Sequence, residues 1–256
     1  MTLESREPLD NRPGIGLRED GVPDIDWVPI PAGDVVLQGD AGKQTVGPFA
    51  IARYPVTHCQ FQAFVDAPDG YRAETWWHDL ERQEPVAARW TERNAPRETV
   101  SWYEAVAFCR WLGERLNLTL RLPDEWEGEQ AATAGDSANV FPWGSDWNPK
   151  GEPFRANTFE SRLGAATAAG MYPGGASPAE VLDMAGTVLE WCLNKHDSPE
   201  VTESGVRDFD RRVLRGGSWY DNQDDARSAF RFRYYPYYRF NNVGFRVLCS
   251  SPIVDH

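Results

Sequence analysis

Two short glycine-containing motifs near the C-terminus enclose a segment that is unusually rich in aromatic residues. The motifs are Leu214–Trp219 (LRGGSW) and Val243–Arg246 (VGFR), and the segment between them includes the run RFRYYPYYRF. Neighbouring residues in a loop point in different directions, and a loop offers few partners for buried phenol hydroxyls. Of the four tyrosines that surround Pro236, at least two or three should therefore be exposed.

The composition of this segment is typical of a recognition surface. Tyrosine combines a large, stiff contact area with few rotatable bonds, and arginine adds a planar cation. The candidate ligand-binding residues are Tyr220, Asp221, Asn222, Phe230, Phe232, Tyr234, Tyr235, Tyr237, Tyr238, Phe240, Asn241 and Asn242. The arginines among them are Arg227, Arg231, Arg233 and Arg239. These arginines either form an electropositive patch capable of cation–π contacts or stack on aromatic rings to hold the loops.

Charge and cysteine content exclude several kinds of partner. A formal net charge of -13 in 256 residues disfavours nucleic acid and anionic membranes as general partners. The first residues, MTLESRE, lack the apolar core of a signal peptide, and no apolar run is long enough to cross a bilayer. The cysteines, Cys59, Cys109, Cys192 and Cys249, show no CxxC spacing, so we expect reduced, buried thiols. These features predict a cytoplasmic protein.

No linker divides the middle of the chain, so a single large domain is expected. Residues 1–25 are charged and rich in Pro and Gly, and they are predicted to form a tether or irregular segment. Such a start suits a domain attached, in a larger chain, to an effector on its N-terminal side. Residues 26–251 are predicted to form the domain, with residues 252–256 as a short tail.

Helix signals followed by strand signals predict an α+β fold. Capping boxes at Thr57–Gln60 and Ser101–Glu104 open two helices, the first of which should end by Pro68. Pro123–Glu127 opens a third helix that should end near Gly135, with its acidic residues in a solvated first turn. Strands are predicted at 27–38, 188–192, 212–215 and 244–249, with long loops between them.

Ten short motifs occur along the chain in an order typical of one family. They are Ile30–Gly33 (IPAG), Tyr54–Thr57 (YPVT), Pro96–Trp102 (PRETVSW), Arg121–Trp126 (RLPDEW), Phe141–Gly144 (FPWG), Ala156–Asn157, Leu182–Gly186 (LDMAG), Glu190–Trp191, Arg215–Trp219 (RGGSW) and Val243–Arg246. Together they resemble the formylglycine-generating-enzyme/sulfatase-modifying-factor domain. The resemblance covers about residues 26–250, and it implies a C-type-lectin-like fold with small antiparallel sheets, a few helices and long loops.

The same resemblance argues against catalysis. Oxidases of this family hold copper with a pair of cysteines shortly after the Gly-Gly-Ser-aromatic motif, since Cu(I) prefers thiolates. The corresponding window, Tyr220–Ala229, contains no cysteine, so no copper is expected. Another branch binds iron through histidines, but His58, His78, His196 and His256 show no paired spacing. Ser218 remains a candidate nucleophile, although a serine in a Gly-Gly-Ser turn is more often structural.

The chain lacks the cysteines of the oxidases, and its aromatic segment resembles that of the variable proteins of diversity-generating retroelements, several of which carry the same fold. Their diversified positions are enriched in Tyr, Phe, Asn, Asp, Ser and His, and the residues between them stay fixed. The resemblance implies a variable region over residues 215–249, in which exposed side chains vary on one backbone. The alternative is that aromatic residues are simply common in this part of the family, and for that reason Phe230 is the candidate expected to be buried.

Two further features have open interpretations. Some relatives bind calcium through an Asn and a Glu at positions that match Asn157 and Glu190, so these two are weak candidates for a structural calcium site. Thr187 stands where a stronger oxygen donor is usual. The tryptophans at 76, 77 and 90 either pack on the helices, which we favour, or wall a ligand groove.

The sequence therefore predicts a non-enzymatic ligand-binding protein whose C-terminal aromatic segment recognises a partner. A protein surface is the favoured partner, since exposed Tyr and Arg are frequent in protein hot spots. Two alternatives remain open. One is an oxidase of the sulfatase-modifying kind that has lost its copper cysteines, and the other is a regulatory domain with a single fixed partner. A purely structural domain would instead bury the tyrosines.

Overall fold

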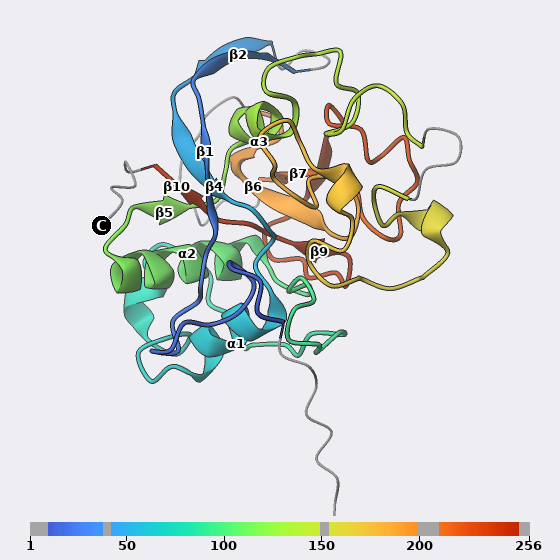
Figure 1. Cartoon of the computed structure of the whole chain (residues 1–256). Coiled ribbons are helices and arrows are strands. Elements are labelled where there is room, and N and C mark those ends of the chain that lie inside the picture. The colour runs from blue at the N-terminus through green and yellow to red at the C-terminus, as the bar shows by residue number, and fades with distance from the viewer. Residues whose placement is uncertain (1–9, 38–41, 149–153, 199–209, 251–256) are drawn as a thin grey trace, which may run out of the picture.

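The computed structural model describes residues 10–37, 42–148, 154–198 and 210–250, and Figure 1 shows their arrangement. These residues form three α-helices, three short 3-10 helices and small β-sheets connected by long loops. The predicted α+β class is confirmed. The first nine residues of the predicted tether, and the predicted tail, lie outside the described residues.

Residues 10–25 were predicted as part of a tether, but they pack against the domain. Ile15 is 1% exposed, and its carbonyl oxygen accepts a hydrogen bond from Thr57 Oγ1 at 2.7 Å. Gln60 Nε2 donates to the carbonyl oxygens of Gly14, at 3.1 Å, and Asp24, at 2.6 Å. The predicted start of the ordered domain at residue 26 is therefore too late. Charge and Pro/Gly content indicate irregular backbone, but they do not reveal these partners on a distant helix.

All three helices begin at capping boxes. Helix α1 (His58–Asp66) follows Thr57, whose amide donates to Gln60 Oε1 at 2.9 Å. Helix α2 (Trp102–Leu116) has Ser101 and Glu104 in the same roles. Helix α3 (Glu125–Thr133) uses Asp124 and Glu127, so its N-cap lies one residue after the proline that was expected in its first turn. Each helix thus starts where side-chain oxygens satisfy its free N–H groups.

One four-stranded sheet joins the two ends of the chain. Its order is β1 (Trp27–Ile30), β4 (Phe49–Ala52), β10 (Leu248–Cys249) and β5 (Leu120–Arg121), and all its pairs are antiparallel. In Figure 1 the red C-terminal strand β10 lies between blue β4 and green β5. Strands β2 (Gly33–Val36) and β3 (Lys43–Val46) form a separate two-stranded ribbon.

The second four-stranded sheet carries the C-terminal motifs. Its order is β8 (Phe232–Tyr234), β7 (Arg212–Arg215), β6 (Leu189–Lys195) and β9 (Val243–Gly244), and its β6–β9 pair is parallel. The single strand predicted at 244–249 is divided into β9 and β10. Phe245, Arg246 and Val247 cross between the two sheets there and are fully buried.

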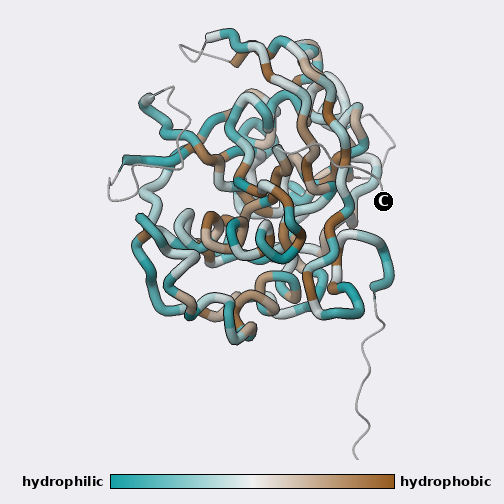
Figure 2. The backbone as a smooth tube through the Cα atoms, turned by 90° about the vertical axis from the view of Figure 1, so that its left-hand side faces the viewer, coloured by the Kyte–Doolittle hydropathy of each residue, from teal (hydrophilic) through white to brown (hydrophobic). Residues whose placement is uncertain are grey.

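The main core surrounds α2. Phe61 stacks on Phe108 at a centroid separation of 5.8 Å, and Phe245 packs edge-on against Phe108 at 5.4 Å. Trp77 is buried against Tyr71, and Trp76 packs on the same core, which confirms packing on the helices for these two tryptophans. Figure 2 shows the hydrophobic segments gathered in the middle of the molecule and hydrophilic segments on the outer loops.

The four cysteines are free and buried, as predicted. Within the described part of the chain, no helix has the length and apolar character needed to cross a bilayer.

Candidate ligand-binding surface

The two C-terminal motifs form a buried frame that holds the aromatic segment at both ends. Strand β7 ends at Arg215, and Gly216 and Gly217 then turn the chain with φ angles of +90° and +68°. A Cβ atom on Gly217 would lie 2.9 Å from the carbonyl oxygen of Asp225, so the turn requires glycine. At the other end, Val243 and Phe245 are fully buried. The segment between these points therefore starts and ends in the core.

The six aromatic side chains between residues 232 and 240 contact one another, and we call them the aromatic surface. They are Phe232, Tyr234, Tyr235, Tyr237, Tyr238 and Phe240. Ring centroids lie 4.5 Å apart for Tyr234 and Phe240, and 5.6 Å apart for the stacked pair Tyr235 and Tyr237. Tyr235 and Tyr238 are 39% and 38% exposed, and the other two tyrosines are half-buried. The prediction that at least two tyrosines are exposed is confirmed.

The backbone of the aromatic surface is held by the chain at the start of α2. The Trp102 amide donates to the carbonyl oxygen of Pro236 at 3.0 Å. The Thr99 amide donates to the carbonyl oxygen of Phe240 at the same distance, 3.0 Å. Both contacts use main-chain atoms, so they do not depend on which side chains the aromatic surface carries.

Arg239 adds one side-chain anchor. Its Nε donates to Glu104 Oε2 at 2.8 Å, and its Nη1 donates to the carbonyl oxygen of Glu84 at 2.9 Å. Glu104 is completely buried, and it also accepts from the Ser101 amide at 2.7 Å and from the Tyr71 hydroxyl at 2.7 Å. One carboxylate thus caps α2 and anchors the loop. Burial raises the pKa of Tyr71, and the nearby Glu104 carboxylate adds to the effect.

A polar cluster lies where the two motifs meet. Ser218 Oγ donates to Asp221, and Asn242 Nδ2 donates to Ser218 Oγ at 3.0 Å. The Trp219 indole N–H donates to the carbonyl oxygen of Asn241 at 3.3 Å. Burial raises the pKa of the Asp221 carboxyl. These contacts place three of the candidate residues directly on the frame.

All twelve candidate residues reach the surface to some degree. Tyr220, Asn222, Phe232, Tyr235 and Tyr238 are exposed, whereas Asp221, Phe230, Tyr234, Tyr237, Phe240, Asn241 and Asn242 are half-buried. The expected burial of Phe230 is therefore wrong. Its ring stacks on Phe232 at 6.3 Å, and the buried positions of this stretch are filled by Ala226 and Ser228.

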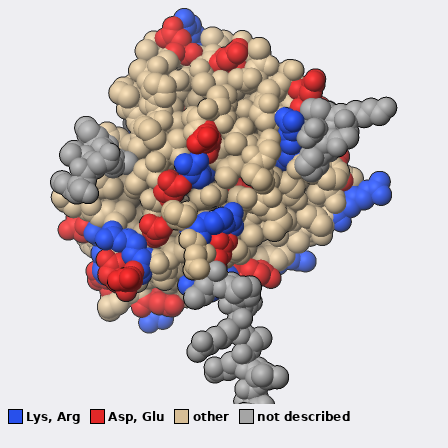
Figure 3. All heavy atoms as spheres, in the orientation of Figure 1, with Lys and Arg blue, Asp and Glu red and all other residues tan. Residues whose placement is uncertain are grey.

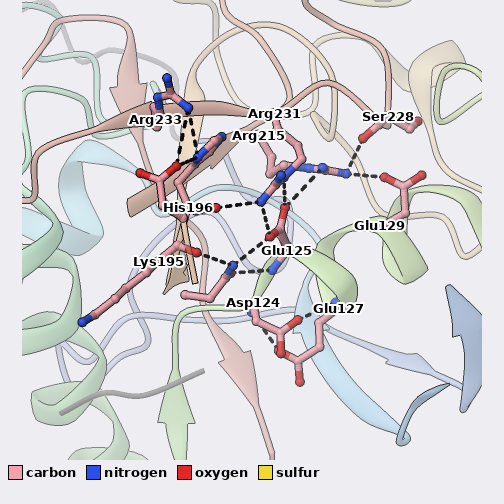
Figure 4. A network of polar contacts seen from close by, with 12 residues as sticks. Asp124, Glu125, Glu127, Glu129, Lys195, His196, Arg215, Ser228, Arg231 and Arg233 are labelled. Carbon is pink, nitrogen blue, oxygen red and sulfur yellow. Dashed lines mark hydrogen bonds and ion pairs between the residues drawn. The ribbon is translucent and has the colours of Figure 1, made fainter. Parts of the chain in front are cut away.

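The arginines of the segment form no electropositive patch, and they do not stack on its rings. Figure 4 shows Arg231 directed at Glu125, with Nη2 donating to Oε1 at 2.8 Å, and Arg233 beside His196. Arg227 Nε donates to the Asp224 carbonyl oxygen at 2.8 Å. Among the described residues, the arginine-over-ring contacts involve other arginines. Both predicted roles are wrong for Arg231, Arg233 and Arg239, because carboxylates remote in sequence lie opposite these guanidinium groups.

The acidic residues at the start of α3 are buried, which contradicts the predicted solvated turn. Glu125 and Glu129 face Arg215 and Arg231, and Glu129 pairs with Arg215 (Figure 4). Glu127 pairs with Arg121 at 2.6 Å. Buried carboxylates of this kind need such partners, since an unpaired charge in the interior is costly.

Trp90 lies beside the frame, and sequence reasoning did not favour this position. Its ring packs edge-on against Trp219 at 5.4 Å, and Trp219 packs against the exposed Tyr220 at 5.7 Å. The half-buried Trp90 therefore extends the aromatic cluster that ends at the exposed Tyr220, whereas Trp77 belongs to the core and Trp76 packs against it. No local sequence signal separates these three tryptophans.

A family model described as the sulfatase-modifying factor enzyme 1-like domain matches residues 19–251. The chain belongs to this family. The inactive C-alpha-formylglycine-generating enzyme 2 of Bos taurus is 30% identical over 84% of this chain and 80% of that protein. Hercynine oxygenase of Mycobacterium tuberculosis is 32% identical over 78% of this chain, but the match covers only 52% of that protein.

Two solved structures show the same fold as this sulfatase-modifying-factor-like domain. PvdO from Pseudomonas aeruginosa superposes with a TM-score of 0.70 at 23% identity, over 93% of this chain and 98% of that one. The variable protein 1 of Treponema denticola superposes with a TM-score of 0.67 at 22% identity, over 89% and 96% of the two chains. The resemblance stated from the ten motifs is confirmed for family and fold.

The thiols of this family member are poorly suited to the copper chemistry of its oxidase relatives. The window after the Gly-Gly-Ser motif has no cysteine, and Cys249 is a fully buried residue of β10. Burial raises the pKa of the Cys192 thiol, which opposes formation of a thiolate. The described residues contain no group of three His, Cys, Asp or Glu side chains placed to share a metal ion.

The two calcium candidates are each engaged by the protein. Asn157 Oδ1 accepts from Ser161 Oγ at 2.9 Å. Both carboxylate oxygens of Glu190 accept from Arg246, at 2.6 and 2.7 Å. A calcium ion needs several oxygen ligands that are free to turn toward it. The donor set as arranged therefore does not fit calcium.

Proposed function

We propose that this chain is a non-catalytic binding domain and that its aromatic surface, with Tyr220 and the polar cluster beside it, recognises a protein partner. The observation that carries the proposal is the way the loop is anchored. Its backbone is held by Trp102, Thr99 and the Arg239–Glu104 pair, so the rings of Tyr235 and Tyr238 are not needed to hold it. Side chains that do not maintain the fold are available to a ligand.

The same anchoring supports diversification of the segment by a retroelement. The twelve candidate residues are exposed or half-buried, whereas Arg215, Ser218, Phe245 and Arg246 of the frame are buried. Substitution at an exposed position changes the free energy of unfolding by about 0.5 kcal/mol or less, so many variants would keep the fold. The free, buried thiols agree with a role in the reducing cytoplasm.

The absence of the copper cysteines from the sequence favours binding over oxidation. The relatives named as inactive formylglycine-generating enzymes, in Bos taurus and Mus musculus, support a non-catalytic role, because they indicate that members without this activity exist in the family.

The first experiment replaces Tyr235, Tyr237 and Tyr238 together by alanine. We expect the triple variant to lose little stability, since Tyr235 and Tyr238 are exposed and only Tyr237 is half-buried against the core. Phe245→Ala is the matched control, because this ring is fully buried against Phe61 and Phe108. Its loss should lower the free energy of unfolding by about 3–5 kcal/mol. Unfolding of the triple variant would show that the tyrosines are structural and would refute the proposal.

Diversification has its own test in the nucleotide sequence around the coding region. We expect a near-copy of the stretch that encodes residues 215–249, differing only where the copy has adenine, beside a reverse transcriptase. Without such a copy, the domain would bind one fixed partner through the same surface.

A further inference from the structure

The charges around the aromatic surface indicate which kind of partner it accepts. The arginines nearest to it are already compensated, because Arg239 pairs with Glu104 at 2.8 Å and Arg233 lies 3.6 Å from Asp197. The protein as a whole carries a net charge of -13. The surface thus presents aromatic rings without a surplus of positive charge.

Carboxylates flank the rings on two sides. On one side, Asp221 accepts a hydrogen bond from Ser218 Oγ, which also accepts from Asn242 Nδ2 at 3.0 Å, two residues after Phe240 of the aromatic surface. On the other side, Gln83 Nε2 donates to the Tyr237 carbonyl oxygen at 3.4 Å, two residues after the exposed Glu81. The segment 81–84 lies against the loop, since Arg239 donates to the Glu84 carbonyl oxygen at 2.9 Å.

The exposed rings have faces that no arginine of the described residues covers. Among the described residues, the rings beneath a guanidinium are those of Tyr54, Phe61, Trp90, Trp102 and Trp111. Tyr220, Tyr235 and Tyr238 are exposed and are not in that set. On the face drawn in Figure 3, several basic and acidic side chains lie next to one another between broad uncharged areas.

We propose that the aromatic surface binds a basic protein segment, with lysine or arginine side chains of the partner placed over the Tyr235 and Tyr238 rings and near the flanking carboxylates. Cations are attracted to the faces of aromatic rings, and a nearby carboxylate adds to that attraction. This inference rests on the proposed binding function and adds the chemistry of the partner.

The test selects random short peptides from a display library on the immobilised protein. Each enriched peptide is then measured on the Tyr235→Ala/Tyr238→Ala variant. We expect peptides enriched in Lys and Arg whose affinity falls about two- to five-fold for each ring removed. Glu81→Gln should weaken the same peptides about two-fold, because an exposed charge contributes little. Glu114→Gln is the matched control, since it removes the same charge from an exposed position near the other end of α2 and should change nothing.

The outcomes separate this inference from the function it rests on. Peptides that require both tyrosines but are neutral or acidic would overturn the basic-partner inference and leave the binding function in place. Selection that yields no tyrosine-dependent peptide would overturn both. Equal weakening by Glu81→Gln and Glu114→Gln would show a general charge effect and would count against a local site.

Discussion

Removal of the Arg239 guanidinium should loosen the aromatic surface and destabilise the fold. Arg239→Met keeps much of the side-chain volume but leaves the buried Glu104 carboxylate without its cation at 2.8 Å. Breaking a buried ion pair costs about 3–5 kcal/mol because the remaining charge is stranded. Glu104 retains hydrogen bonds from the Ser101 amide and the Tyr71 hydroxyl, which reduces the loss. We therefore expect the free energy of unfolding to fall by about 2–3 kcal/mol.

The assay is urea unfolding, supported by thermal unfolding and hydrogen exchange. For a domain of this size the expected loss lowers the melting temperature by about 5–10 °C. The Trp102 amide should exchange faster, because its acceptor is the Pro236 carbonyl oxygen of the loop that Arg239 anchors. Arg227→Met is the control, since its guanidinium donates to the exposed Asp224 carbonyl oxygen and pairs with no carboxylate of the described residues. Its loss should cost about 0.5 kcal/mol or less. Equal stability of the two variants would refute the anchoring argument.

Four further predictions concern single substitutions in the interior, in a turn and in α3. Burial raises the pKa of Asp183 from 3.8 to about 6, so the folded protein holds this proton more tightly than the unfolded chain. Ionising the buried carboxyl therefore lowers the free energy of unfolding; this loss is absent below pH 3.8 and complete above pH 6. In the unmodified protein this group should lower the free energy of unfolding by about 3 kcal/mol between pH 3.8 and pH 6, as measured by urea titrations at each pH. In Asp183→Asn this fall should be absent. Thr187 is buried with a φ of +62° and a hydroxyl without a partner among the described residues, so Thr187→Gly should raise the free energy of unfolding by about 1 kcal/mol. A loss of stability in thermal unfolding would contradict this. Gly217→Ala should destabilise the protein in the same assay, because the turn requires glycine. Gly128→Ala lies in α3, where no atom is near the added Cβ, and it should stabilise the protein by about 0.5–1 kcal/mol.

Local features of the sequence predicted the helices well, but features that depend on residues far apart in the chain were not predicted. The boxes at Thr57–Gln60 and Ser101–Glu104 determine helix starts through residues three apart, so they can be identified without a fold. The boundary at residue 26 and the division of 244–249 into β9 and β10 depend on strands and helices far away in the chain. The exposure of Tyr235 and Tyr238 was predictable because a loop cannot bury adjacent large polar rings on all sides.

The sequence by itself determined the family, the three helix starts and the lack of cysteines after the Gly-Gly-Ser motif. These properties depend on residue identity and on short spacings. Only the tertiary structure decided the roles of Arg231 and Arg239, which pair with Glu125 and Glu104 across 106 and 135 positions of the chain. Whether an arginine is a free cation or a buried anchor depends on the charge opposite to it, and folding alone brings those charges together. The surface that remains is aromatic and flanked by carboxylates.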